Sequence, residues 1–290
     1  MGMTKKTSKH TPSLKIPKII LLTSKLSSFI APKLITLFAA KLFTTPIKHK
    51  IPKRELEMDR KSVQKLIPVP AINKEVVLYQ YGKSEKKILL VHGWSGRGTQ
   101  LFKIADELLK AGYSTISFDA PAHGKSPGKT TIMVDFIATI LEIEKQFGPF
   151  EAAIGHSLGG MSVLNAIKKG LKVNHAVVIG SGDIVEDIMD DFVAKLELKP
   201  SVSTLLRLHF EKKYGEKMNS YSAFLAAKET TIPVLVIHDN NDPEVPVKAG
   251  IHIHEYLKNG ELLLTDGLGH RKILGNPKVI ERTIQFIQNK

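Results

Sequence analysis

The sequence predicts an α/β protein whose mostly parallel β-sheet is covered by helices on both faces. From about residue 66 onward, short runs rich in Val, Ile and Leu alternate with longer segments whose apolar residues recur at helical spacing. The short runs are apolar at nearly every position, which is typical of strands buried on both faces. The chain has 290 residues, 42% of them hydrophobic, which is enough to build a core of this kind.

Each expected element can be placed from its pattern and its flanking turns. Strands are expected at residues 76–81, 88–92, 114–119, 152–155, 176–179, 234–238 and 262–265. Helices are expected at residues 101–110, 132–147, 158–169, 247–257 and 278–288. Residues 181–232 show no clear strand and only two helical patterns, at 184–196 and 205–214. We therefore expect a helical insertion, a cap, at about residues 182–231, within a main domain that spans residues 66–290.

The composition excludes several classes of function. Without cysteine, the chain has no thiolate nucleophile, no Cys-ligated zinc and no iron–sulfur cluster. The formal net charge is +14, but residues 1–54 hold eleven lysines, one arginine and no acidic residue. The rest of the chain is almost neutral, with 30 basic and 28 acidic residues. A nucleic-acid-binding domain usually carries its positive charge on the folded body, so no nucleic-acid partner is expected.

The basic N-terminal arm, residues 1–65, is neither a signal peptide nor a membrane-spanning segment by its pattern, because polar residues and prolines interrupt every apolar run. Residues 19–43 instead predict an amphipathic helix. Its apolar face holds Leu26, Ile30, Leu34, Leu37, Phe38 and Leu42, and the opposite face holds Lys25, Ser28, Pro32, Lys33 and Thr36. This helix either packs its apolar face on the main domain or lies on an anionic membrane surface. We expect a cytoplasmic protein, with a peripheral membrane position as the alternative.

A candidate nucleophile lies in the segment Gly155-His156-Ser157-Leu158-Gly159. This G-x-S-x-G pattern falls between an expected strand and an expected helix, which is the context it requires. The small residues on either side allow a strained turn that exposes the serine hydroxyl above the sheet. Ser157 is therefore the predicted nucleophile.

A serine needs a base, and the base needs an acid to orient it. In a fold with this turn, the acid and then the histidine follow the serine, each after a late strand. His270 is the only histidine after residue 254, which makes it the candidate base. The loop after the strand at 234–238 offers three candidate acids, Asp239, Asp242 and Glu244.

These motifs, in this order, resemble a serine hydrolase of the α/β-hydrolase superfamily over roughly residues 70–290. The segment from His238 to Pro246 is similar to the family's H-G-x-x-D-x-x-V-P loop, and this similarity selects Asp242 as the triad acid. Gly269-His270 matches the loop of the triad histidine, and His92-Gly93-Trp94 stands where the family has its oxyanion loop. The resemblance implies that the backbone N–H groups of Trp94 and Leu158 bind the oxyanion.

Other features of the resemblance concern the surroundings of the site. The segment from Asp119 to Ser126 resembles the family's D-x-P-G-H-G-x-S loop, with Ala122 in place of a glycine, and we interpret it as structural support. The insertion at residues 182–231 stands where the superfamily usually has its cap. His252 and His254 are two residues apart on an expected helix, so their side chains point to different faces and do not form a paired metal site.

The function expected from the resemblance is the hydrolysis of a small-molecule carboxylic ester or thioester through an acyl-enzyme on Ser157, without cofactor or metal. A serine at this position argues against the dehalogenase and epoxide hydrolase branches, which use aspartate there. One alternative is an acyltransferase or cofactor-free perhydrolase that uses the same triad. The other is a catalytically silent α/β-hydrolase that acts as a membrane-docked binding protein. The pattern of the sequence does not define the substrate, because pocket walls and cap set specificity.

Overall fold

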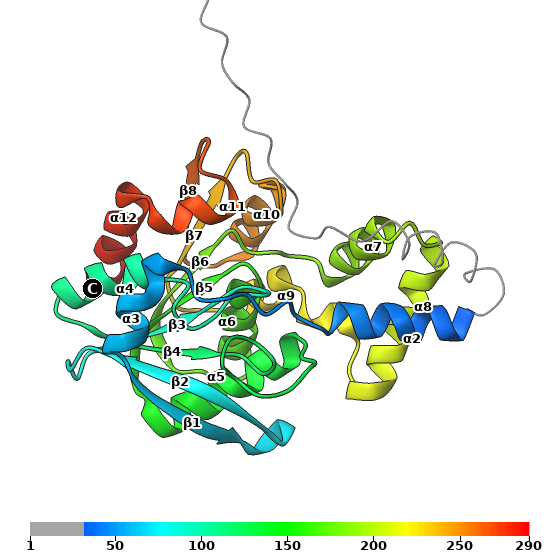
Figure 1. The fold of residues 1–290 in the computed structure, drawn as a ribbon. Coiled ribbons are helices and arrows are strands. Elements are labelled where there is room, and N and C mark those ends of the chain that lie inside the picture. The colour runs from blue at the N-terminus through cyan, green and yellow to red at the C-terminus, as the bar shows by residue number, and fades with distance from the viewer. Residues whose placement is uncertain (1–31, 290) are drawn as a thin grey trace, which may run out of the picture.

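The computed structural model describes residues 32–289 and contains an eight-stranded sheet (Figure 1). The strand order is β1-β2-β4-β3-β5-β6-β7-β8. β2 pairs antiparallel with β1 and β4, and all other neighbours are parallel. The strands are β1 (Val63–Val69), β2 (Lys74–Tyr81), β3 (Lys87–Val91), β4 (Ser114–Asp119), β5 (Phe150–His156), β6 (Val173–Ile179), β7 (Val234–Asp239) and β8 (Gly260–Thr265). The mostly parallel sheet expected from the sequence is thus confirmed.

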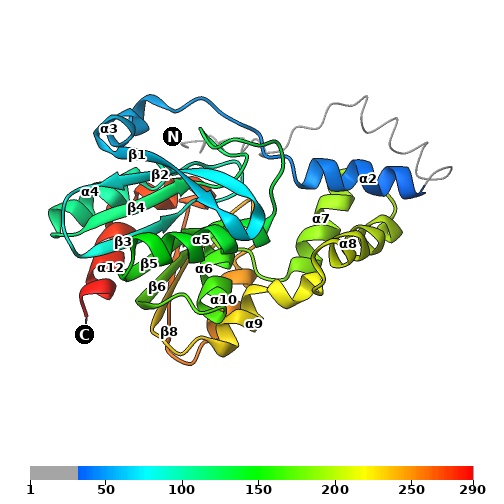
Figure 2. The same cartoon turned by 90° about the horizontal axis from the view of Figure 1, so that it is seen from below.

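Helices cover both faces of this sheet, as Figure 2 shows. One face packs against α3 (Leu56–Lys61), α4 (Phe102–Lys110) and α12 (Pro277–Gln288). The other packs against α5 (Met133–Phe147), α6 (Leu158–Lys168) and α10 (Lys248–Tyr256). Strand β3 shows why its pattern is continuously apolar: Ile88 and Leu90 join one core cluster, and Leu89 joins the other. Each side of the strand is buried, so neither tolerates polar residues.

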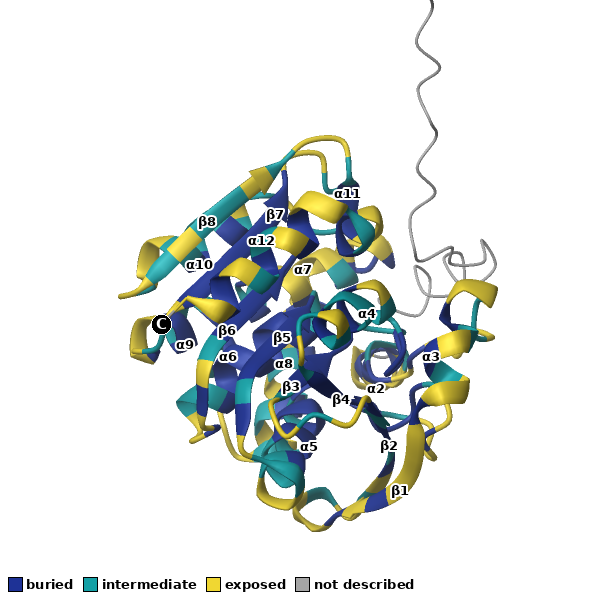
Figure 3. Cartoon of the chain, turned by 90° about the vertical axis from the view of Figure 1, so that its left-hand side faces the viewer, coloured by how far each residue is buried: buried dark blue, intermediate teal, exposed yellow. Residues whose placement is uncertain are grey.

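The strand that the sequence analysis missed is β1, at the edge of the sheet. Its residues from Val63 to Leu66 are exposed, whereas Ile67 and Val69 are buried (Figure 3). A strand covered on one side only, with a proline at position 68, lacks the apolar run that marks the inner strands. The expected boundary between residues 65 and 66 falls inside β1.

The expected insertion between β6 and β7 forms three α-helices, α7 (Val185–Lys195), α8 (Pro200–Tyr214) and α9 (Ala223–Glu229). Helix α8 begins at Pro200 rather than at residue 205, and α9 had no predicted counterpart. The cap helices α7 and α8 extend away from the sheet on the side where β6 ends (Figures 1 and 2).

The N-terminal helix α2 (Pro32–Phe43) lies beside α8 of the cap (Figures 1 and 2). The ring of Phe43 contacts those of Phe192 and Phe210 at centroid distances of 5.0 and 5.8 Å. The buried residues of α2 are Ile35, Thr36, Ala39 and Ala40, whereas Leu34, Leu37 and Phe38 are exposed.

Helix α2 packs on the body, one of the two expected arrangements, but mainly through Ile35, Thr36, Ala39 and Ala40. Of the expected apolar face, Leu42 packs against the core, whereas Leu34, Leu37 and Phe38 are exposed. The small residues of the other face allow α2 to approach α8 closely, which the hydrophobic pattern does not reveal. Residues 19–31 of the expected helix, including Leu26 and Ile30, lie outside the described residues.

Candidate active site

Ser157 occupies the sharp turn between β5 and α6. Its backbone has φ 54° and ψ −121°, a conformation that residues other than glycine adopt only under strain. A Cβ on Gly155 would lie 2.4 Å from the carbonyl oxygen of Gly159, and a Cβ on Gly159 would lie 2.3 Å from that of Val91. Both glycines of the pattern are therefore required by the close approach of backbone segments around the serine.

Asp242 and His270 are brought together from the loops after β7 and β8. His270 Nδ1 lies 2.7 Å from Asp242 Oδ2, and both side chains are buried. The other carboxylate oxygen, Oδ1, accepts hydrogen bonds from the backbone N–H groups of Glu244 (2.8 Å) and Val245 (2.9 Å). Burial alone would raise the pKa of Asp242, but the hydrogen bond and charge of His270 and the two N–H groups outweigh it and lower the pKa.

Asp239, another candidate for the acid that orients His270, has different hydrogen-bond partners. Its Oδ2 accepts hydrogen bonds from the Thr265 hydroxyl (2.7 Å) and the Leu268 N–H (3.0 Å), and its Oδ1 accepts one from the Asn241 N–H (3.0 Å). These bonds join the loops after β7 and β8 to each other. Glu244 pairs with the exposed Arg271 at 3.2 Å. Of the three candidate acids, Asp242 is the one placed against His270.

His156 connects the serine turn to the His270 loop. Its Nε2 donates to the His270 carbonyl oxygen at 2.9 Å, and the two imidazole rings lie 4.6 Å apart. Within residues 32–289, no hydrogen bond joins Ser157 directly to His270. Catalytic hydrogen bonds are often long before substrate binds, so this arrangement is compatible with a nucleophile and its base.

The loop after β3 lies against the serine. A Cβ on Gly93 would come within 2.9 Å of the Ser157 Cβ, so only glycine fits there without movement. The backbone N–H groups of Trp94 and Leu158 have no hydrogen-bond partner in the described part of the chain. An oxyanion hole requires backbone N–H donors without an internal partner, so these two are candidates for it.

Two buried histidines fix the position of this loop. His92 Nδ1 donates to the Gly93 carbonyl at 2.7 Å, and its Nε2 accepts from the Ala120 N–H at 2.9 Å. His123 Nε2 accepts the N–H of Ser95 at 3.0 Å. These bonds require neutral rings, and burial lowers the pKa of His123 to about 4. His92 and His123 therefore support the loop in their uncharged form.

The segment from Asp119 to Ser126 also forms hydrogen bonds with this loop, as expected of structural support. Asp119 accepts hydrogen bonds from the Gly98 N–H (2.7 Å), the Lys125 N–H (2.6 Å) and the Tyr79 hydroxyl (2.9 Å). Ala122, which replaces the usual glycine, is buried with a left-handed φ of 65°. The backbone thus keeps a conformation that favours glycine although the side chain has changed.

Sequence reasoning missed the contribution of the N-terminal segment, residues 44–55, which we call the strap. Glu55 is buried and accepts hydrogen bonds from Arg97 Nη1 (2.9 Å) and Thr99 Oγ1 (2.8 Å). The Ile47 N–H donates to Ser95 Oγ at 3.0 Å. The one available signal was that Glu55 is the first acidic residue of the chain.

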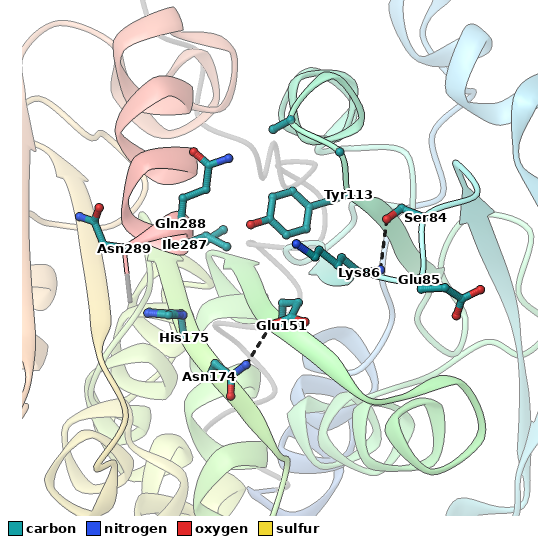
Figure 4. Close-up of a pocket in the computed structure, with 12 residues that line it drawn as sticks. Ser84, Glu85, Lys86, Tyr113, Glu151, Asn174, His175, Ile287, Gln288 and Asn289 are labelled. Carbon is teal, nitrogen blue, oxygen red and sulfur yellow. Dashed lines mark hydrogen bonds between the residues drawn. The ribbon is translucent and has the colours of Figure 1, made fainter.

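The described residues contain no group of three or more His, Asp or Glu side chains placed to hold a metal ion. A shallow hollow of about 880 Å³ lies at the opposite edge of the sheet, where the parallel strands begin (Figure 4). Lys86, Glu151 and His175 are among its lining residues. The hollow is far along the strands from Ser157 and plays no part in the candidate site.

Similarity to known proteins agrees with this fold. An esterase from Pyrococcus furiosus is 18% identical, with a TM-score of 0.64 over 84% of this chain and 98% of that one. An esterase from Exiguobacterium antarcticum is 16% identical, with a TM-score of 0.63 over 78% of this chain and 100% of that one. A bromoperoxidase from Bacillus anthracis is 17% identical, with a TM-score of 0.61 over 78% and 100%.

At these identities the solved structures establish the fold alone, and no curated protein matches the chain. The sequence profile described as "Alpha/beta hydrolase family" matches residues 88–277, which include Ser157, Asp242 and His270. The chain therefore belongs to the alpha/beta hydrolase family.

Proposed function

We propose that this protein is a serine hydrolase that cleaves a carboxylic ester or a thioester. The observation that carries the proposal is the buried hydrogen bond between Asp242 and His270. The His270 backbone is bonded to His156, the residue before a serine in a strained turn. A carboxylate bonded to Nδ1 holds the imidazole in the tautomer whose Nε2 accepts a proton. A serine exposed at such a turn is accessible to an acyl carbon.

In the proposed reaction, Ser157 Oγ attacks the acyl carbon while His270 takes the hydroxyl proton. Asp242 stabilises the resulting imidazolium, and the N–H groups of Trp94 and Leu158 bind the developing oxyanion. His270 then donates its proton to the leaving alcohol or thiol, and an acyl-enzyme remains on Ser157. Water, deprotonated by His270, releases the acid and restores the serine.

Transfer of the acyl group to an acceptor other than water is the second candidate function. The similar solved structures include a bromoperoxidase as well as esterases, so acyl transfer is tested beside hydrolysis. Both functions require the same acyl-enzyme and differ only in the group that attacks it. A catalytically silent binding protein, the third alternative, forms no acyl-enzyme.

Labelling with a fluorophosphonate tests the proposal directly. The probe phosphonylates an activated serine, so the wild-type protein is expected to label in a pH-dependent manner. Ser157→Ala is expected to abolish labelling, and turnover of p-nitrophenyl esters with it. Ser162→Ala is the matched control, because this serine lies in helix α6, which begins directly after Ser157, and its hydroxyl donates to the Leu158 carbonyl.

Labelling that persists in purified Ser157→Ala would exclude the assigned nucleophile. An unlabelled wild-type protein would favour the silent binding protein. Once the nucleophile is established, p-nitrophenyl esters from acetyl to palmitoyl, compared with acyl-CoA thioesters, define the substrate class. Adding an alcohol or hydrogen peroxide to the same assay separates acyl transfer from hydrolysis.

A further inference from the structure

The outer face of α2 exposes three large apolar side chains. Leu34, Leu37 and Phe38 are 68%, 52% and 38% exposed, respectively. Their spacing of three and four residues places them on one face of the helix. The opposite face already packs on the cap through Thr36, Ala39 and neighbouring residues. We call this exposed set, together with Lys33 and Lys41, the α2 face.

The α2 face and residues 44–54 of the strap carry only positively charged side chains. Lys33 and Lys41 lie on α2 itself and are exposed. The residues that follow include the exposed basic side chains Lys48, Lys50, Lys53 and Arg54. Residues 32–54 contain no acidic residue.

We propose that the α2 face docks on the surface of an anionic lipid bilayer. Apolar side chains bordered by lysines on a short helix are the features of a helix that lies in the membrane interface. The basic residues are attracted to anionic headgroups, while Leu34, Leu37 and Phe38 enter the boundary between headgroups and acyl chains. No described helix has the length and hydropathy needed to cross a membrane.

Charge argues against the other occupants of this face. A second copy of the chain would place one all-basic segment against another. Residues 1–31 are also basic without a single acid, so they too would bring like charge to the α2 face. The cap helices α7 and α8 with their connection offset this field only weakly, because residues 185–214 hold six acidic and five basic residues and are nearly neutral.

Docking in this way would bring the cap to the bilayer surface. Helix α2 packs on α8, and the strap leads from α2 to the loop that holds Trp94 through the bond from Ile47 to Ser95. Figures 1 and 2 show α2 beside the cap, on the side of the sheet where β6 ends. Ser157, at the end of β5, lies at this same carboxyl edge.

Co-sedimentation of the full-length protein with vesicles tests the proposal. Vesicles of phosphatidylcholine with about 30% phosphatidylglycerol are expected to bind the protein, and pure phosphatidylcholine vesicles to bind it at least about tenfold more weakly. Raising the salt from about 0.1 to 0.5 M should weaken binding without abolishing it, because screening removes only the electrostatic part. Circular dichroism verifies that each variant is folded.

Two pairs of variants separate the apolar from the basic contribution. The triple substitution Leu34→Ser, Leu37→Ser and Phe38→Ser should weaken binding at least about tenfold, most clearly at high salt. Its control is Val63→Ser with Leu66→Ser, on two apolar residues of β1 that are 58% and 55% exposed. Lys33→Gln with Lys41→Gln should weaken binding at low salt, whereas Lys65→Gln with Lys83→Gln should not.

Three results would overturn the proposal. The first is a wild-type protein that ignores anionic vesicles at low salt. The second is a triple variant that binds as tightly as the wild type. The third is a wild-type dimer in sedimentation equilibrium that the triple substitution dissociates, which would assign the α2 face to a second copy. Fluorophosphonate labelling in the absence of vesicles reports on Ser157 independently, so failure here leaves the proposed hydrolase unaffected.

Discussion

Two aspartates near the end of β7 lie three residues apart and have different hydrogen-bond partners. Asp242 directs one carboxylate oxygen at His270 and the other at backbone N–H groups. Asp239 accepts its hydrogen bonds from Thr265, Leu268 and Asn241 and does not contact His270. The first arrangement orients an imidazole, and the second joins two loops.

This difference predicts opposite phenotypes for two conservative changes. Asp242→Asn should lower kcat by about 10⁴-fold, because an amide no longer holds His270 in the tautomer that accepts a proton. Asp239→Asn should leave most of kcat intact and mainly lower stability, since it weakens bonds within the loops. Measuring kcat and urea unfolding for both proteins checks the ranking. The reverse order would assign the role of triad acid to Asp239.

The three candidate residues Ser157, Asp242 and His270 could be chosen from the sequence because each follows a strand that its apolar run predicts, and parallel strands present their carboxyl ends at one edge. The choice between Asp239 and Asp242 depended on resemblance to a family. Which carboxylate reaches the imidazole is decided by the path of the loop after β7, and its turn geometry has no simple sequence signal. In the structure, the hydrogen bond between Asp242 and His270 distinguishes the two aspartates.

At the scale of elements, the strap joins the N-terminal segment to the candidate oxyanion loop. The buried Glu55 carboxylate binds both Arg97 and Thr99, whose side chains flank the turn at Gly98. The Gly98 N–H in turn binds Asp119. The loop that carries Trp94 is thus hydrogen-bonded both to the strap and to the segment that begins at Asp119.

Substituting Glu55→Gln tests whether the strap positions this loop. The change keeps the size of the side chain but leaves Arg97 buried without its ion pair, which should lower the free energy of unfolding by about 3 kcal/mol. Where the protein is still folded, kcat should fall more than KM changes, because a displaced oxyanion donor affects the transition state most. Denaturant unfolding and steady-state kinetics measure the two effects.

Glu57→Gln is the matched control for this substitution. Its carboxylate is exposed and pairs with Lys61 within helix α3, so both stability and kcat should change little. A Glu55→Gln protein that loses stability while keeping full kcat would show that the strap has a structural role alone.

Elements were predictable from the sequence where both of their faces are buried. The inner strands satisfy this condition. The edge strand β8 was predicted from its run of leucines although none of its residues is fully buried, whereas β1, which is exposed from Val63 to Leu66, was missed. Helix α2 was expected from its period, but its orientation depends on the small residues that meet α8. Tertiary packing of this kind leaves no trace in a hydrophobic pattern.

At the scale of the whole molecule, several buried histidines make stability depend on pH. Burial, assisted by the nearby charge of His270, lowers the pKa of His156 to about 3, and burial lowers that of His123 to about 4. Burial and the proximity of His123 also place the pKa of His92 well below its usual value. The Nδ1 atom of His156 is buried without a partner among the described residues, as suits a neutral ring.

A histidine whose pKa is depressed by folding lowers stability as the pH falls. Above about pH 6.5 the ring is neutral in both states and stability does not change with pH. Below that value the ring binds a proton in the unfolded chain but not in the folded one. Each such ring therefore lowers the free energy of unfolding by about 1 kcal/mol per pH unit until its folded pKa is reached. The lowered pKa of Asp242 acts in the same direction at lower pH, whereas the raised pKa of Asp119 opposes it.

The free energy of unfolding should therefore be flat between about pH 8 and 7 and fall steeply between about pH 6 and 5. Urea unfolding across this range measures the slope. His156→Asn should flatten it by about 1 kcal/mol per pH unit, because one proton is removed from the difference between the states. His49→Gln, at an exposed histidine of the strap, is the control and should keep the full slope. A wild-type protein equally stable at pH 7 and pH 5 would mean that these rings take up protons without unfolding, in conflict with their burial and their bonds to the loops around Ser157.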